Sequence, residues 1–302
     1  MKFDGDTSGN AEEPPEILID EVLKMDRLLY LKIIQEKEPI TSLQVTRETL
    51  ALKNKIKHKQ VKNKEIKKAN PNINKRLKDL TRLGILNDYE GEYSLSCIGV
   101  LIVDDLTRMK SNIEVLREYK DFFDTHDHTV IPLQQFREIY NLQFAKQSKD
   151  SLYYLKEITS NTLTVQHRIY IATERLHDIP GWIIEEIRKG NLELKIIYQF
   201  KKPFKINSDI EEELELWKKL IEDDLAGAEF RYISLENRSP LGIRIVDNKW
   251  AIFNLVKAAS AELNRAESFF GTNEQFIAWI ENVFLNIWKK SKKLEINKIT
   301  VI

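Results

Sequence analysis

The apolar positions in the first part of the chain recur with the period of amphipathic helices. One such face runs along residues 17–36 and predicts a helix that Pro39 ends. Residues 41–54 are compatible with a further helix, whereas the lysine-rich stretch up to residue 62 leaves its own order open. The spacing i, i+4 and i+7 then marks the buried face of another helix, in Ile73, Leu77 and Leu80.

This last helix is predicted to cover residues 72–83 and to follow a short basic helix at 64–68. Residues 70–71, Asn-Pro, would form the turn between them, because proline suits the first position of a helix. Gly84 ends the second helix, and a strand–turn–strand hairpin follows, turning at residues 90–91. Two helices and a hairpin in this order are typical of a winged helix-turn-helix, an α+β domain whose second helix enters the DNA major groove.

The distribution of charge strengthens this interpretation. The 302-residue chain has a formal net charge of zero, from 47 Lys and Arg against 47 Asp and Glu. Residues 53–82 nevertheless contain twelve basic and two acidic residues, a net charge of +10, so the remainder carries −10. A basic patch on a neutral chain favours a nucleic-acid site over a solvated lysine-rich loop.

Double-stranded DNA is therefore the expected partner. The outward face of the helix at 72–83 should contact base edges and phosphates, and the lysines before it should contact phosphates. The predicted contacts are Asn72, Lys75, Arg76, Lys78 and Arg82 on this helix, Lys64 and Lys67 before it, and Tyr93 beside the wing turn.

Residues 100–123 predict a long helix with a seam of apolar residues spaced four and three apart, which Lys120 interrupts. The seam indicates either a homodimer contact or an ordinary amphipathic helix packed on its own domain. Residues 132–158 also read as helical, so residues 100–160 are predicted to be a linker and dimerisation region. The seam consists of Ile102, Leu106, Met109, Ile113, Leu116 and Phe123.

Strand and helix patterns alternate in the predicted last domain, residues 161–302. The order β-α-β-α-β predicts an α/β layer with a largely parallel sheet. The three strands of this layer are expected at 168–173, 192–198 and 229–233, and its helices at 178–189 and 209–225. A hairpin with strands at 242–246 and 250–256 should follow, with its turn at 247–248. A final helix is expected at 273–290. The buried stripe of that last helix is Phe276, Ile280, Phe284, Ile287 and Trp288.

Composition excludes several classes of protein. No apolar run is long enough for a transmembrane helix, so no membrane partner is expected. Residues 1–16 are polar and acidic, which predicts a disordered leader before a DNA-binding domain at 17–99. Cys97 is the single cysteine and favours a cytoplasmic location. The chain has no glycine-rich phosphate-binding motif, so no cofactor is expected.

A ligand of the last domain should bind at the carboxyl ends of its parallel strands. The candidate ligand-binding residues are Thr173, Glu174 and Gln199 at these ends, and Arg244, Trp250 and Phe253 in the hairpin. The alternative is that the domain serves only for packing and dimerisation. His126 and His128 lie on one turn, but two histidines without further ligands at a defined spacing do not predict a metal site.

Four segments together resemble archaeal winged-helix transcriptional regulators of the methanogenesis-regulator type. These are INKRLKDLTRLGIL (73–86), YSLSCIGVLI (93–102), DFFDTHDHTVIP (121–132) and IRIVDNKWAIFNL (243–255). The resemblance covers about residues 20–290 and implies a DNA-binding homodimer. It also implies that the C-terminal half senses a small-molecule or protein effector. The chain departs from the family in the stretch between its first helix and the recognition helix, which is longer than usual.

The C-terminal half also resembles the phospholipase D fold, whose catalytic members carry the motif H-x-K-x-x-x-x-D. The resemblance implies a histidine nucleophile and a phosphate-binding lysine. Aligning Asp247 with the motif's aspartate places Pro240 at the histidine position and Gly242 at the lysine position. A catalytically dead effector domain, with no catalytic residues, is therefore expected. The alternatives are a phosphodiesterase or nuclease of this type, and a winged helix that binds protein.

Overall fold

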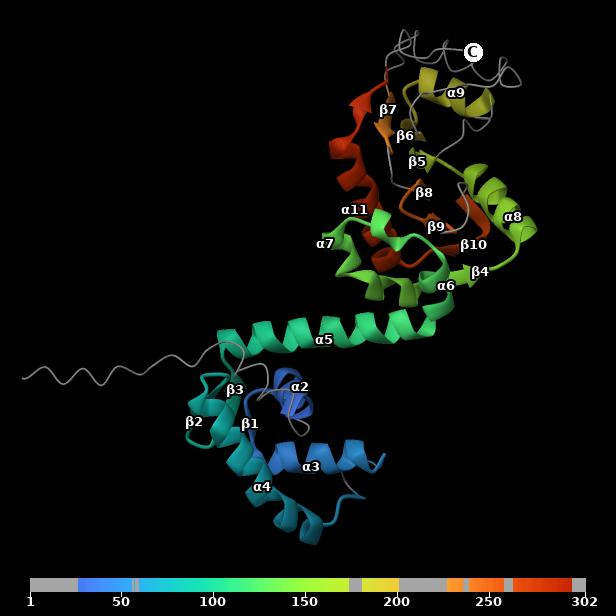
Figure 1. The fold of residues 1–302 in the computed structure, drawn as a ribbon. Helices are drawn as coiled ribbons and strands as arrows, with labels where there is room; N and C mark the ends of the chain where they lie inside the picture. Colours follow the sequence, from blue (N-terminus) through green and yellow to red (C-terminus); the bar gives the residue numbers. More distant parts are fainter. Residues whose placement is uncertain are drawn as a thin grey trace, which may run out of the picture. The chain divides into compact units, whose positions relative to one another are not determined.

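The computed structural model describes residues 27–55, 57, 60–173, 181–200, 227–235, 239–257 and 263–294. The chain divides into two compact units, residues 1–109 and 110–302 (Figure 1). The expected leader at 1–16, the expected helix at 209–225 and the candidate Glu174 lie outside the described residues. Among the described helices, none combines the length and the apolar character needed to cross a membrane.

The first unit combines helices with a small antiparallel sheet. Its elements are α2 (Arg27–Lys37), β1 (Ile40–Thr41), α3 (Ser42–Lys53), α4 (Asn63–Arg82), β2 (Leu86–Tyr89), β3 (Glu92–Leu95) and the first part of α5 (Cys97–Glu118). The strand order is β1-β3-β2, with Ile40 opposite Tyr93 and Leu86 opposite Leu95. Strand β1 was not expected, because two residues are too few to show an alternating pattern.

Helix α4 differs from the prediction. One continuous helix contains Pro71, where a turn between two helices was expected. The proline removes only one backbone hydrogen bond, to the Lys67 carbonyl group. The apolar face continues on both sides of the proline, and its burial outweighs that loss. The buried side chains of this face are Ile66, Ile73, Leu77 and Leu80.

Helix α3 takes the place of the expected basic helix at 64–68 as the partner of α4. It begins with a capping box, in which the Thr41 hydroxyl oxygen accepts from the Gln44 N–H and the Gln44 side chain accepts from the Thr41 N–H. The Thr46 hydroxyl of α3 donates to Oδ1 of Asn70 on α4 at 3.0 Å. The two helices therefore meet next to the proline of α4.

The end of α4 and the hairpin after it agree with the prediction. Gly84 has a φ of +72°, and the Ile85 N–H donates to the Leu80 carbonyl oxygen, which is a common way to end a helix. Glu90 and Gly91 have φ values of +54° and +86° at the tip of the β2–β3 hairpin. Positive φ at both central residues suits a tight two-residue turn.

The long helix predicted after the hairpin is broken at Tyr119, where α5 has already ended. Val103 of α5 belongs to the core of the first unit, and Val115 belongs to the core of the second. Met109 and Ile113, two members of the predicted seam, are 45% and 41% exposed. The homodimer contact stays a prediction.

The second unit is a mixed sheet with helices on both faces. Its elements after α5 are α6 (Lys120–Thr125), η2 (His128–Val130), α7 (Leu133–Phe136), η3 (Ile139–Phe144), β4 (Lys146–Ser148), α8 (Ser151–Thr162), β5 (Arg168–Thr173), α9 (Gly181–Arg188), β6 (Glu193–Phe200), β7 (Ala228–Ser234), β8 (Leu241–Val246), β9 (Trp250–Val256), β10 (Leu263–Gly271), α11 (Glu274–Lys290) and β11 (Lys292–Lys293). The stretch at 132–158 was predicted to be helical throughout. It instead consists of short helices, strand β4 and part of α8.

The sheet has the strand order β11-β7-β6-β5-β8-β9-β10-β4. The prediction of a largely parallel sheet is wrong, since only the β5–β6 and β6–β7 pairs are parallel among the described strands. Strands β8 and β9 are joined by a tight turn and must therefore run antiparallel. The turn lies where it was predicted, at Asp247 and Asn248, which have φ values of +51° and +58°.

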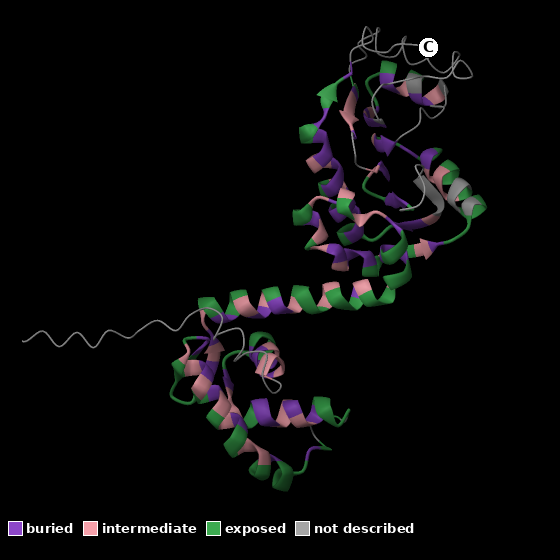
Figure 2. Ribbon diagram, viewed as in Figure 1, coloured by how far each residue is buried: buried purple, intermediate pink, exposed green. Residues whose placement is uncertain are grey.

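Alternate residues of the strands fill two hydrophobic clusters on opposite faces of the sheet, where the strands are buried in Figure 2. Helix α11 packs its side chains into one cluster, against strand residues that include Tyr170 and Phe253. Helix α9 supplies the other, which includes Ile171 and Trp250. The predicted stripe of α11 is confirmed as core, in Phe276, Ile280, Phe284, Ile287 and Trp288.

Candidate nucleic-acid interface

The outward side of α4 is a row of basic side chains. At 3.6 residues per turn, Lys64, Lys68, Lys75, Lys78 and Arg82 fall within a sector of about 80°, opposite the buried face. From Lys64 to Lys78 the row is about 21 Å long, at 1.5 Å per residue. Six exposed side chains of α4 have no hydrogen bond or ion pair to another described residue. They are Lys64, Lys67, Lys68, Asn72, Lys75 and Lys78.

The two flanks of α4 are tied to the rest of the first unit. On one flank, the Arg76 guanidinium donates to the Tyr30 hydroxyl of α2 at 2.8 Å. On the other flank, the Tyr93 hydroxyl of β3 donates to Asn74 Oδ1 at 3.1 Å. These contacts fix the rotation of α4, so that the lysine row faces outward.

The expectation for Tyr93 needs correction. Its side chain is 2% exposed, so it cannot reach a phosphate without leaving the core. Burial raises the pKa of the Tyr93 hydroxyl, and the carboxylate of Asp88 adds to the increase, so the group stays a neutral donor. Tyr89, which is 78% exposed near the tip of the hairpin, is the tyrosine of the β2–β3 hairpin that lies at the surface.

Arg82 lies at the end of α4 beside an acid. Its guanidinium is 3.7 Å from the Asp79 carboxylate, which is also 3.9 Å from the guanidinium of Arg27. The Arg82 side chain is 79% exposed, and an exposed pair of this kind is weak. Arg82 is therefore accessible, whereas Arg76 is partly buried and engaged.

The candidate ligand-binding residues that the structure describes in the second unit do not come together. Thr173, Arg244 and Trp250 belong to one face of the sheet, because they alternate with residues of the other. Gln199 and Phe253 belong to the opposite face. Four of these residues have structural surroundings: Gln199 Nε2 donates to the Leu241 carbonyl oxygen at 2.6 Å, Arg244 donates to the Thr162 hydroxyl at 3.0 Å, and Trp250 and Phe253 are core residues.

A pocket of about 520 Å³ lies instead at the amino ends of β5 and β6, opposite the expected edge. Sequence reasoning missed it because its lining comes from three separate segments. The lining residues are Val165, Gln166, His167, Trp182, Glu186, Asn191 and Leu192.

The positions aligned with the phospholipase D motif have local structural roles. Gly242 lies opposite Asn254, and any Cβ at this glycine would overlap Asn254 Oδ1. The Asp247 carboxylate accepts hydrogen bonds from three successive backbone N–H groups just before and at the start of β5. The donors are Gln166 at 2.7 Å, His167 at 2.8 Å and Arg168 at 2.8 Å.

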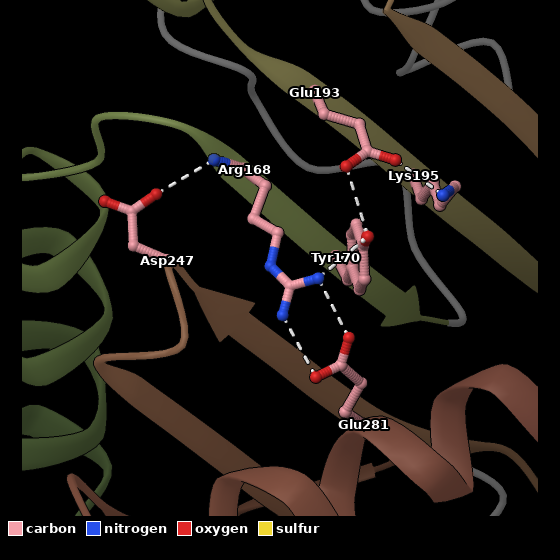
Figure 3. A network of polar contacts seen from close by, with 6 residues as sticks. All are labelled: Arg168, Tyr170, Glu193, Lys195, Asp247 and Glu281. Atoms are coloured by element: carbon pink, nitrogen blue, oxygen red, sulfur yellow. Dashed lines mark hydrogen bonds and ion pairs between the residues drawn. The ribbon is translucent and has the colours of Figure 1, made fainter. Parts of the chain in front are cut away.

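A polar network lies on the face of the sheet that packs against α11 (Figure 3). The Arg168 guanidinium donates to the Glu281 carboxylate of α11 at 3.0 Å and to the Tyr170 hydroxyl at 3.1 Å. The Tyr170 hydroxyl donates to Glu193 at 3.2 Å, and Lys195 also pairs with Glu193. The charges balance within the network, which links β5, β6 and α11.

The histidines of the turn after α6 pack against aromatic rings, and the His128 ring stacks on the Phe136 ring at a centroid distance of 5.5 Å. Nδ1 of His126 lies 2.9 Å from the Phe122 carbonyl oxygen, and its ring stacks on the Phe122 ring at 4.1 Å. Asp127 accepts from the Thr129 N–H and hydroxyl. Within the described ranges, no three His, Cys, Asp or Glu side chains gather in a way that could hold a metal ion.

No family model and no curated protein matches this sequence. Among solved structures, parts of the chain are similar to TrmBL2, an archaeal chromatin protein, with 13% identity, a TM-score of 0.37, and coverage of 74% of this chain and 83% of that one. NucT from Helicobacter pylori matches with 12% identity, a TM-score of 0.34, and coverage of 50% and 99%. Phosphatidylserine synthase from Haemophilus influenzae Rd KW20 matches with 17% identity, a TM-score of 0.34, and coverage of 47% and 37%. Likeness at this level assigns no function to the chain.

Proposed function

We propose that this protein binds double-stranded DNA through the outward face of α4 and acts as a transcriptional regulator. This lysine face consists of Lys64, Lys67, Lys68, Lys75 and Lys78. On this proposal, the first unit is a winged helix-turn-helix, with α3 and α4 as the helix pair and the β2–β3 hairpin as the wing. Helix α4 enters the major groove, and the exposed Tyr89 side chain lies near the phosphates beside it.

The observation that carries the proposal is the set of unpaired lysines on one side of α4. Five exposed lysines there have no acidic partner among the described residues: Lys64, Lys67, Lys68, Lys75 and Lys78. Like charges this close repel each other, and a polyanion removes that cost. Phosphate contacts release counterions from DNA, which makes such binding strong at low salt.

The second unit is proposed to regulate this binding in a homodimer. Exposed apolar residues of α5, Met109 and Ile113, suit a contact between two copies. An effector of the second unit would then change the spacing of two α4 helices, provided that it binds one spacing better than the other. The chain is proposed to be cytoplasmic, in keeping with its single free Cys97.

We also propose that the second unit is not catalytic, as opposed to a phosphodiesterase or nuclease. Pro240 and Gly242 carry no nucleophile and no cation at the aligned motif positions, and Asp247 is engaged by backbone N–H groups. The full chain should leave bis(p-nitrophenyl) phosphate and plasmid DNA uncleaved, with and without divalent cations. Turnover that is lost in Asp247→Asn would contradict this part of the proposal.

Binding of the purified full chain to fluorescein-labelled duplexes, followed by anisotropy at low salt, tests the DNA proposal. The double variant Lys75→Ala/Lys78→Ala should lose most of its affinity. The matched control Lys289→Ala/Lys290→Ala removes two exposed lysines from the end of α11 and should bind like the wild type. Equal losses in the two variants would mean that general charge, and not the α4 face, attracts the DNA.

A further inference from the structure

The side chains of α4 differ in how well they can distinguish one base pair from another. Planar side chains with two hydrogen-bonding atoms, arginine and asparagine, pair bidentately with base edges. A lysine ammonium group is a flexible point charge that binds phosphate well and discriminates bases less. Base recognition by α4 therefore depends on which of its planar side chains are available to DNA.

Most planar side chains on α4 are already committed within the first unit. Asn70 accepts from Thr46 of α3, and Asn74 accepts from the hydroxyl of the buried Tyr93. Arg76 is partly buried and donates to the Tyr30 hydroxyl. Using any of these groups for base contacts would break a contact that holds α4 in place.

Three planar side chains of α4 remain exposed, and they occupy different places. Asn63 is the first residue of the helix and Arg82 is its last, next to Asp79. Asn72 lies near the middle, is exposed, and has no hydrogen bond to another described residue. It lies four residues after Lys68 and three residues before Lys75 of the lysine row, about one helical turn from each, so phosphate contacts by these lysines would bring it to the groove floor.

We infer that Asn72 is the residue of α4 that reads base identity, and that it selects an adenine, whereas the lysines supply affinity without sequence preference. This inference rests on the proposed DNA binding. The amide of Asn72 accepts from adenine N6 and donates to adenine N7. The DNA site should therefore have one strongly preferred A·T pair for each bound copy of α4 and weak preferences elsewhere.

Selection from a random duplex library with the full chain, followed by sequencing, tests the inference. The wild type should enrich one A·T position for each copy, with a preference of roughly 5- to 150-fold over other pairs at that position. Asn72→Ala should lose this preference but keep most of its affinity for unselected duplexes. Asn63→Ala, an exposed asparagine on the same helix, should keep the preference and serves as the matched control.

The outcomes separate the inference from the proposed function. A preference that survives in Asn72→Ala, or a guanine preference that disappears in Arg82→Ala, would overturn the role of Asn72 and leave DNA binding intact. Binding of every duplex with no enriched position would do the same. A wild-type chain that binds no duplex at low salt would remove the proposed function itself.

Discussion

The Asp247 carboxylate offers a direct test of how the second unit is held together. It sits in the turn between β8 and β9 with a φ of +51° and accepts from three successive backbone N–H groups near β5. A hydrogen bond to a charged group contributes about 1.5–3 kcal/mol when it is shielded from water. The first two N–H groups belong to Gln166 and His167, which are exposed. Water can therefore replace their hydrogen bonds to Asp247 with little loss of free energy. The Arg168 N–H is partly buried and dominates the loss.

The variant Asp247→Ala should therefore lower the free energy of unfolding by about 3 kcal/mol or more. This total combines the Arg168 bond with about 1–2 kcal/mol for placing alanine at positive φ. Asn248→Ala is the matched control, because Asn248 has a φ of +58° in the same turn and should show only the backbone cost. Asp247→Asn tolerates positive φ and keeps one oxygen acceptor, so its loss should be intermediate.

Urea unfolding followed by tryptophan fluorescence measures these differences. All five tryptophans lie within residues 110–302, so the signal reports the second unit alone. The reasoning fails if Asp247→Ala and Asn248→Ala lose the same free energy of unfolding. In that case the carboxylate contributes nothing beyond its backbone conformation.

Two further predictions concern the interior of the second unit. Gly242→Ala should lower the free energy of unfolding by about 1–3 kcal/mol, because the added Cβ would overlap Asn254 Oδ1. Adding Asn254→Ala should recover part of this loss in a double-mutant cycle. Burial lowers the pKa of His126 below its ordinary value near 6.5. The hydrogen bond to the Phe122 carbonyl group and the charge of Glu267 oppose this shift, and Lys257 adds to it. The unfolded chain then takes up the proton first, so urea midpoints should fall as the pH drops below about 6.5. His126→Asn, which keeps a donor but does not titrate, should flatten that fall; an unchanged pH profile would contradict the assignment.

The sequence predicted the elements whose signals are local. Strand β5 has the predicted bounds, 168–173, because it is a short apolar run between polar segments. Helix α11 has the predicted buried stripe, and the turns at 90–91 and 247–248 contain residues that tolerate positive φ.

The errors came from effects between distant residues. A local rule for Pro71 predicted a helix start, but burial of Ile66 and Leu77 along one face carries the helix through it. The direction of strands β8, β9 and β10 relative to β5 depends on register across the sheet, which one sequence does not reveal. Strand β4, Lys146–Ser148, pairs at the sheet edge and is too short and polar to be recognised alone.

The candidate site was predictable only in part. The charge of α4 and its outward face could be read from spacing, and the positions of Lys75 and Lys78 agree with that reading. The engagement of Arg76 by Tyr30 and the burial of Tyr93 arise from packing between α2, α4 and β3. Local sequence carries no signal for such contacts, because each partner is far away along the chain.

The salt dependence of DNA binding tests the central claim most directly. For the wild type, the logarithm of the association constant should fall linearly with the logarithm of salt concentration, with a slope of about −0.9 for each phosphate contact. Lys75→Ala/Lys78→Ala should make that slope shallower by roughly 1.8, whereas Lys289→Ala/Lys290→Ala should leave it unchanged. Binding that is insensitive to salt, or a slope that the α4 variant does not alter, would contradict DNA recognition by the lysine face of α4.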